Sequence, residues 1–184
     1  FSDRSRLFFS FFSSKDNFFT KYNYQEYVVG EQASTTIGVS DENNAYWGNL
    51  LGSLRWNYLI NKQLFVNSQL AYSRFKYEYN TTEYDVLNQG VLTSNSSYFS
   101  GVHDFIGKID FDYRPSINHT LRFGINSTAH TFQPGIETSR QLVEADIAID
   151  TIFGGNPIRG VELHGYLEDD WTISRRLKAN LGIR

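Results

Sequence analysis

Four histidines are the side chains best suited to hold a metal ion, because imidazole nitrogens are common ligands of zinc. They are His103, His119, His130 and His164. No two of them stand at the spacing of a helical or hairpin metal site with a carboxylate as the third ligand. The sequence contains no cysteine, which also excludes thiolate sites and disulfide scaffolds. We therefore predict no metal site and no other cofactor.

Three consecutive carboxylates, Glu168, Asp169 and Asp170, raise the question of acid and base catalysis. Hydrolysis of a glycoside needs two carboxyl groups about 5 to 9 Å apart. Adjacent residues of a strand point to opposite faces, so only Glu168 and Asp170 would share one. The simpler interpretation is that these charges line one face of a strand and pair with Lys178, with Arg184 or with a second domain that packs against that face. The sequence predicts no catalytic residue, and hence no enzyme.

The composition favours strands over helices. Aromatic residues make up 16% of the chain, and aromatic side chains fit pleated surfaces. The mean hydropathy is −0.41, and the sequence lacks the about 20 consecutive apolar residues of a transmembrane helix. A transmembrane β-barrel passes that test, because its strands alternate apolar and polar side chains. The net charge of −3, without a cluster of Lys and Arg, argues against nucleic acid as a partner.

Short and long polar stretches alternate along the chain. The short ones are at 2–4, 61–63, 114–118 and 174–176, and the long ones are at about 13–44, 80–97 and 133–159. Tight periplasmic turns and long extracellular loops are typical of an up-and-down outer-membrane barrel. We therefore predict that the long stretches are loops, including 141–153, the only stretch with a hint of helical spacing.

Between these stretches we predict about seven strands, which alternate strictly in polarity. Their ranges are 4–14, 45–60, 63–79, 98–113, 119–133, 159–173 and 177 onward. Around 105–113, for example, Phe105 and Ile109 fall on one face and Lys108 and Asp110 on the other. The parity of the two arms predicts that Asp110 lies opposite Arg122. A slip of one residue would place charges in lipid, so the register should be firmly held.

The two faces yield two predicted sets of residues. The lumen-facing charges are Arg55, Asp104, Lys108, Asp110, Asp112, Arg122, Glu162, Glu168 and Asp170. A lipid-facing aromatic girdle near the short turns comprises Trp56, Tyr58, Phe111, Tyr113 and Trp171. Tyr46 and Phe99 would mark a second girdle near the loops, since 12 residues of a tilted strand rise about 28 Å and the apolar band is about 25 Å tall.

Four segments carry a family resemblance: RSRLFFSFFSSKDNF at 4–18, WGNLLGSLRWNYLINKQLFVNSQLAYSRF at 47–75, FIGKIDFDYRPSINHTLRFGIN at 105–126 and GYLEDDWTISRRLKANLGIR at 165–184. They resemble the β-barrel of Bacteroidetes TonB-dependent outer-membrane receptors. The resemblance implies that residues 1–184 belong to one barrel domain of roughly 22 strands. It also implies a lumen filled by a plug domain, which this sequence lacks, and nutrient import energised by the TonB complex. A surface lipoprotein is a further partner that the resemblance leaves open.

Three functions follow from this reading. The first is an active-transport receptor of a Gram-negative outer membrane, and the second is a passive porin or an assembly barrel without a plug. The third is a soluble β-sandwich binding module, although strands there average only about 5 or 6 residues. No ligand-binding residue can be assigned. Aromatic residues of the long stretches offer contact surface, but ordinary loop packing explains them more simply: Tyr22, Tyr24, Tyr27, Tyr84 and Phe132.

Overall fold

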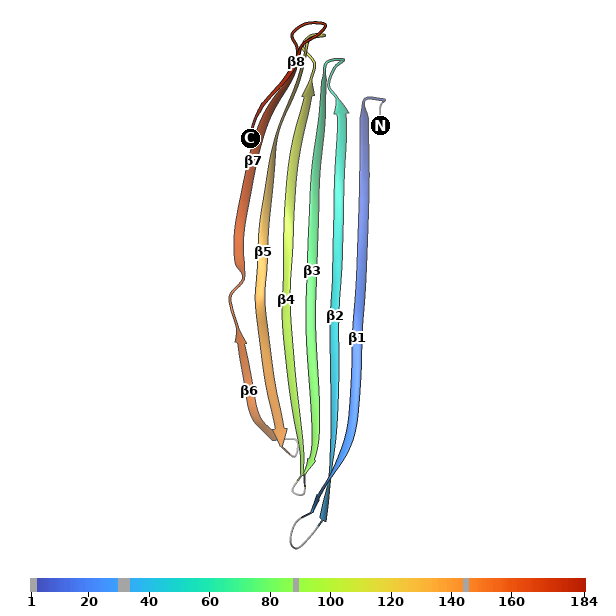
Figure 1. Ribbon diagram of the computed structural model, residues 1–184, viewed down its shortest axis with the longest axis vertical. Coiled ribbons are helices and arrows are strands. Elements are labelled where there is room, and N and C mark those ends of the chain that lie inside the picture. Colours follow the sequence, from blue (N-terminus) through green and yellow to red (C-terminus); the bar gives the residue numbers. More distant parts are fainter. Residues whose placement is uncertain (1–2, 30–33, 88–89, 144–145) are drawn as a thin grey trace.

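The computed structural model describes residues 3–29, 34–87, 90–143 and 146–184, and within them the chain is all β (Figure 1). Its strands are β1 (Ser5–Val29), β2 (Ser34–Leu59), β3 (Leu64–Leu87), β4 (Gly90–Tyr113), β5 (His119–Val143), β6 (Asp146–Gly154), β7 (Ile158–Thr172) and β8 (Lys178–Ile183). They form one antiparallel sheet in the order β1-β2-β3-β4-β5-β7-β8, and β6 pairs with β5 beyond the start of β7. The prediction of an antiparallel up-and-down sheet is confirmed. Closure into a barrel stays a prediction, because the sheet is open.

Each predicted strand matches an observed strand, to within one residue, at the end where the short connections lie. We call this the near end of the sheet and the opposite one the far end. Polar side chains close the connections there. The Asn61 carboxamide oxygen accepts hydrogen bonds from the backbone N–H groups of Gln63 and Leu64, at 2.8 and 2.9 Å. Ser174 caps its turn in the same way, by accepting from the backbone N–H of Leu177 at 3.2 Å.

The predicted long loops are wrong. Strands β1 to β5 run for 24 to 26 residues each, so most of 13–44, 80–97 and 133–159 is strand. The stretch 141–153 holds the end of β5 and most of β6, which adds an eighth strand. The alternation of apolar with polar residues does not continue with the same sign in these segments, which are mostly polar and carry their few aromatic residues on either face. A prediction based on one apolar face per strand therefore ended each strand too early.

Register is continuous over most of the sheet. β3 and β4 pair from Leu64↔Tyr113 to Leu87↔Gly90 without a shift. Between β4 and β5 the parity is as predicted, but Arg122 lies opposite Asp112 and not opposite Asp110. The predicted pair was wrong by two residues, because parity alone does not set the length of the connection at 114–118.

The pairing of β4 with β5 contains a bulge, and the connection between β6 and β7 lies beside it. The pairing of β4 with β5 shifts between Phe99 and Gly101, where β5 carries the extra residue at Pro134–Gly135. Gly135 has φ +129°, a conformation that other residues rarely adopt. A Cβ on Gly135 would also lie 2.8 Å from the ring of Tyr98. The chain between β6 and β7, at 155–157, lies beside this bulge, and the Gln133 side-chain amide donates to the backbone oxygen of Gly155 at 3.1 Å.

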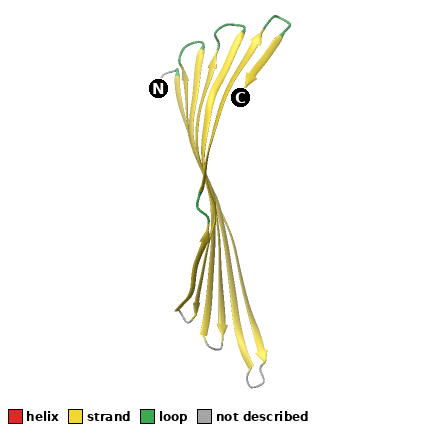
Figure 2. Ribbon diagram, turned by 90° about the vertical axis from the view of Figure 1, so that its left-hand side faces the viewer, coloured by secondary structure: helices red, strands yellow, loops and turns green. Residues whose placement is uncertain are grey.

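The sheet is strongly twisted, so that its strands fan out at both ends (Figure 2). Only Ala45 and Val66 are buried apolar residues among those that the structure describes. The sheet therefore has no hydrophobic core of its own. No helix in the described part of the chain is long and apolar enough to cross a membrane.

Candidate functional site

The two faces of the sheet differ in chemistry, and the register assigns each residue to one of them. We call the side that carries Leu70, Phe105 and Ile125 the Leu70 face, and the side that carries Asp104, Lys108 and Arg122 the Lys108 face. The row Ser13, Leu50, Arg74, His103, Thr131 and Arg159 crosses the Leu70 face from β1 to β7. The near half of the sheet lies between this row and the short connections, and the far half begins at the row.

In the near half, the Leu70 face is apolar from β1 to β8. One paired row across it is Phe9, Leu54, Leu70, Gly107, Ser127 and Leu163. Its large side chains are open to the surroundings. Phe105 is 60% exposed, Ile109 46%, Leu163 72% and Leu181 59%. None of these four is packed into a core of the chain, which is where a soluble sheet would place them.

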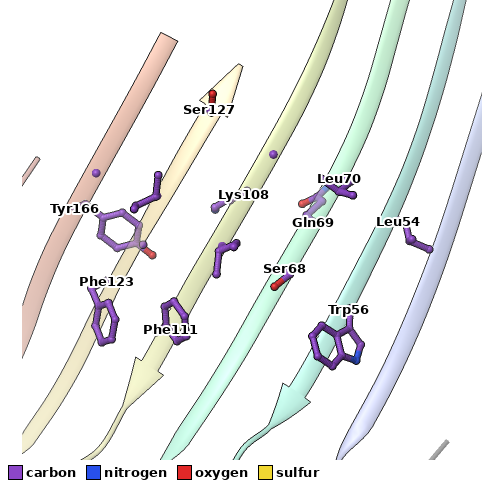
Figure 3. Close-up of a pocket in the computed structure, with 15 residues that line it drawn as sticks. Leu54, Trp56, Ser68, Gln69, Leu70, Lys108, Phe111, Phe123, Ser127 and Tyr166 are labelled. Atoms are coloured by element: carbon purple, nitrogen blue, oxygen red, sulfur yellow. The ribbon is translucent and has the colours of Figure 1, made fainter. Parts of the chain in front are cut away.

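Small residues hollow the middle of this apolar face. Gly107, Ser127 and Gly165 lie beside larger apolar side chains and border a depression of about 900 Å³. Trp56, Phe111 and Phe123 stand at the near-end side of it (Figure 3). Phe111 stacks on Phe123 with ring centroids 5.0 Å apart.

The structure brings the predicted girdle residues together at the near end of the Leu70 face. Trp56 stacks on Tyr58 at 5.3 Å, and its indole N–H donates to the Ser5 hydroxyl at 2.9 Å. Trp171 stacks on the imidazole of His119 at 5.5 Å. Asp169, the one carboxylate that breaks this apolar side, lies 2.7 Å from Nδ1 of His119.

All nine charged residues predicted for the opposite side lie on the Lys108 face, and most contact one another. The Arg122 guanidinium is the centre of a network, at 2.8 Å from Asp170, 3.5 Å from Glu168 and 3.6 Å from Asp112. The Asn180 carboxamide donates to both Asp170 and Glu168, at 2.6 and 2.5 Å. Glu168 and Asp170 thus share a face as expected, but among the described residues their partners are Arg122 and Asn180 and not the predicted Lys178 or Arg184.

A second group of charges on this face lies along β4 and β7. Lys108 lies 3.1 Å from Asp110, which also accepts a hydrogen bond from the Tyr166 hydroxyl at 2.8 Å. Farther along, Nδ1 of His130 lies 2.9 Å from Asp104. Its Nε2 lies 3.8 Å from Glu162.

The Lys108 face is not uniformly polar. Larger apolar side chains also lie on it in the near half, among them Phe8, Phe12, Leu51 and Ile106. The guanidinium of Arg55 covers the ring of Phe8 at 4.7 Å from its centroid, which gives this apolar group a polar surface.

The histidines do not gather. His130 and His164 flank Glu162 on the Lys108 face, whereas His119 lies at the near end of the Leu70 face. His103 contacts the ring of Tyr72 elsewhere on the Leu70 face. Within the described residues, no group of three or more His, Cys, Asp or Glu side chains could hold a metal ion.

In the far half the chemistry of the two faces is exchanged most clearly on β3, which the sequence analysis missed. Toward the far end both kinds of residue occur on both faces, with Phe19 and Phe99 on the Leu70 face and Asp41 and Glu83 on the Lys108 face. The Leu70 face now carries charged residues, among them Lys15, Lys21, Glu42, Arg74, Lys76 and Glu78. The Lys108 face carries aromatic ones, among them Phe18, Trp47, Phe75, Tyr77, Tyr79, Tyr98 and Phe132. The signal was present in the run YSRFKYEY at 72–79, where aromatic and charged residues alternate with period two.

Contacts between strands hold the aromatic side of the far half together. Tyr77 packs edge-on against Tyr98 with centroids 6.2 Å apart, and the Tyr79 hydroxyl donates to the Asn43 side chain at 2.9 Å. Among the loop residues considered for ligand contact, the register places Tyr22, Tyr24 and Phe132 on this face and Tyr84 on the other. The side chain of Tyr27 lies outside the described residues.

Comparison with known proteins adds nothing to this picture, since no family model matches the sequence and no curated protein matches it.

Proposed function

We propose that this chain forms part of the wall of a transmembrane β-barrel in a Gram-negative outer membrane, and that the barrel is a TonB-dependent receptor for nutrient uptake. One observation carries the proposal. Apolar side chains cover the near half of the Leu70 face across seven strands and remain exposed. A soluble protein rarely leaves an apolar patch larger than a few hundred Å² open to water. Acyl chains would cover this face without the cost of ordered water.

The dimensions of the strands suit such a wall. A strand of 24 to 26 residues, with a rise of about 3.3 Å per residue and a tilt near 45°, spans about 58 Å along the barrel axis. The apolar band of an outer-membrane barrel is about 25 Å tall. The near half accounts for the band, and the far half would project from the membrane, where water explains its charged Leu70 face.

An occupied lumen is favoured over an open one by the charges at the near end of the Lys108 face. Four carboxylates, those of Asp110, Asp112, Glu168 and Asp170, surround two cations, Lys108 and Arg122. Lys178, Arg6 and Arg55 lie on the same face. This charged surface suits a plug domain of the same protein that presents charged groups to the wall. The TonB complex, and a surface lipoprotein where one exists, would act on the parts of the receptor outside this chain.

The competing functions make different predictions for the full-length protein. A receptor should enter the detergent phase and leave planar bilayers closed, because a plug would block ions. A steady conductance in the purified protein would favour a passive porin or an assembly barrel. Recovery in buffer without detergent would overturn the membrane assignment and favour a soluble β-sandwich, although the described strands form one sheet with no second sheet packed on it.

A further inference from the structure

A polar hollow lies on the Leu70 face, where the near half meets the far half. It has a volume of about 660 Å³ and is formed by β1, β2 and β3. The side chains that border it on this face include Lys15, Tyr46, Arg74, Lys76, Glu78 and Asn80. Gly48 lies between Lys15 and Lys76 in the paired row, and a Cβ there would lie 2.7 Å from the backbone oxygen of Ser14, so a side chain does not fit. Glycine thus keeps the hollow open between rows of long side chains.

The hollow carries an excess of positive charge. Lys76 lies 3.1 Å from Glu78, and the Asn80 carboxamide also donates to Glu78 at 3.2 Å. Lys15 covers the ring of Tyr46, 5.3 Å from its centroid. Neither Lys15 nor Arg74 has a carboxylate within ion-pair distance among the described residues. Two exposed cations therefore face this space, and Glu78, the carboxylate that borders it, is in an ion pair with Lys76.

The height of the hollow matches the edge of a membrane. Arg74 pairs with Leu50, and Lys76 pairs with Gly48, which are 8 and 10 residues from Tyr58 of the near-end girdle. That distance along a tilted strand rises about 19 to 23 Å, close to the about 25 Å of an apolar band. On the near side of the hollow, Tyr72 and then Leu70 follow on the same strand and face, and Leu70 is 66% exposed in the apolar surface. Cations and acyl-chain surface thus adjoin.

We propose that this hollow binds the phosphorylated headgroup of a membrane lipid, in the leaflet on the far-end side, with its acyl chains along the apolar near half. The inference rests on the proposed function, because it needs the near half to lie in a bilayer. The Arg74 guanidinium is suited to two parallel hydrogen bonds with phosphate, and Lys15 supplies a second positive charge. The hydroxyl of Tyr46 and the amide of Asn80 would contact the rest of the headgroup.

The test uses the full-length protein in detergent and a monophosphorylated glycolipid of the lipid A type, with bound lipid counted by native mass spectrometry. The same glycolipid without its phosphate, and phosphatidylglycerol, are the other two probes. The double variant Lys15→Gln/Arg74→Gln should weaken binding of the phosphorylated glycolipid about tenfold, or about 1.4 kcal/mol. Lys21→Gln is the matched control, since Lys21 lies farther along the same strand and face and pairs with Glu42. It should leave binding unchanged.

Each outcome decides the inference. Tenfold weaker binding of the glycolipid after removal of its phosphate supports the inference. If phosphatidylglycerol binds with the same affinity as the phosphorylated glycolipid, phosphate is the group that the hollow recognises. Equal affinity for the glycolipid with and without phosphate overturns it, as does an unchanged affinity in the double variant. The failure of the proposed function looks different, because the protein would then not enter the detergent phase at all. Lys15 and Arg74 are exposed, so the variant should fold.

Discussion

The near and far halves of the sheet share strands β1 to β5, yet β3 distributes its side chains in opposite ways in the two halves. On β3, Leu70 and Phe75 are both hydrophobic, but Leu70 lies on one face and Phe75 on the other. The backbone register does not change between them, so only the sequence makes the exchange. The surroundings of each face must therefore change along the strand. A sheet that passes from a bilayer into water needs an outer face that is apolar within the membrane and charged beyond it.

The largest effect should come from a charge on the apolar near half. Ile125, 61% exposed on the Leu70 face, is the test position. We expect Ile125→Arg to lower the free energy of unfolding of the full-length protein in lipid vesicles by about 2 to 4 kcal/mol, because an arginine near the bilayer midplane loses its hydration. Urea titration followed by tryptophan fluorescence measures it.

The matched change in the far half is Thr138→Arg, on the same strand and face, since Thr138 pairs with Ser97. There the cost should stay within about 0.5 kcal/mol, as for ordinary surface substitutions. An equal loss of unfolding free energy at the two positions would mean that both halves are surrounded by the same solvent, which would contradict the membrane boundary between them.

The bulge on β5, in the far half just beyond Thr131, should give the next largest effect. Gly135→Ala forces a side chain onto a backbone at φ +129° and against the ring of Tyr98, and should cost about 1 to 3 kcal/mol in unfolding free energy. Gly160→Ala is the control, because a Cβ at Gly160 meets nothing within 4 Å. Similar stabilities of the two variants would show that the bulge is not a fixed feature.

A smaller effect should distinguish the ion pairs of the two halves. Arg122→Gln leaves three carboxylates without their shared cation, and should cost about 1 kcal/mol. Arg140→Gln in the far half breaks a single exposed pair with Asp150 and should cost about 0.3 kcal/mol. Unfolding at low and high salt checks this, since added salt should narrow the difference. If Arg140→Gln proved the more costly, the network around Arg122 would contribute nothing beyond its pairs.

The smallest effect concerns pH in the far half. The hydrogen bond from Asn80, followed by that from Lys76, holds the pKa of Glu78 below its ordinary value of 4.5. A carboxylate with a lowered folded-state pKa stabilises the fold above its unfolded pKa and loses that contribution as the pH falls through the folded value. The wild type should therefore lose slightly more stability than Glu78→Gln as the pH is lowered below 4.5. Parallel pH profiles of the two proteins would contradict this.

The near half could be predicted from the sequence because its pattern is one that apolar periodicity detects. The alternation of Phe105 and Ile109 with Lys108 and Asp110 predicts the strand, the face of each residue and the near end of the hairpin. The far half could not, because Phe75 and Tyr77 lie on the side that carries charges in the near half. A test that expects apolar residues on one face throughout sees the pattern fail. Alternation itself, whatever its sign, would have found the strands.

The contacts within the charged set lay beyond prediction for a different reason. Parity placed Asp112 and Arg122 on one face, but their pairing depended on the length of the connection at 114–118. The network around Arg122 also needs Asn180 beside Glu168, which the pairing of β7 with β8 supplies. Such neighbours come from four strands, β4, β5, β7 and β8, and no periodicity within a single strand reveals them.

The unbroken pairing of β3 with β4 restricts how this chain can change in length. Loss of one residue inside either strand would move every later side chain to the opposite face. Aspartate would then lie on the face that phenylalanine occupies now. Removal of one residue from each arm at the far tip would only shorten the hairpin. Length variation should therefore be balanced between paired arms or arise in steps of two. A single added residue demands a local device that absorbs it, as the glycine and proline of β5 do.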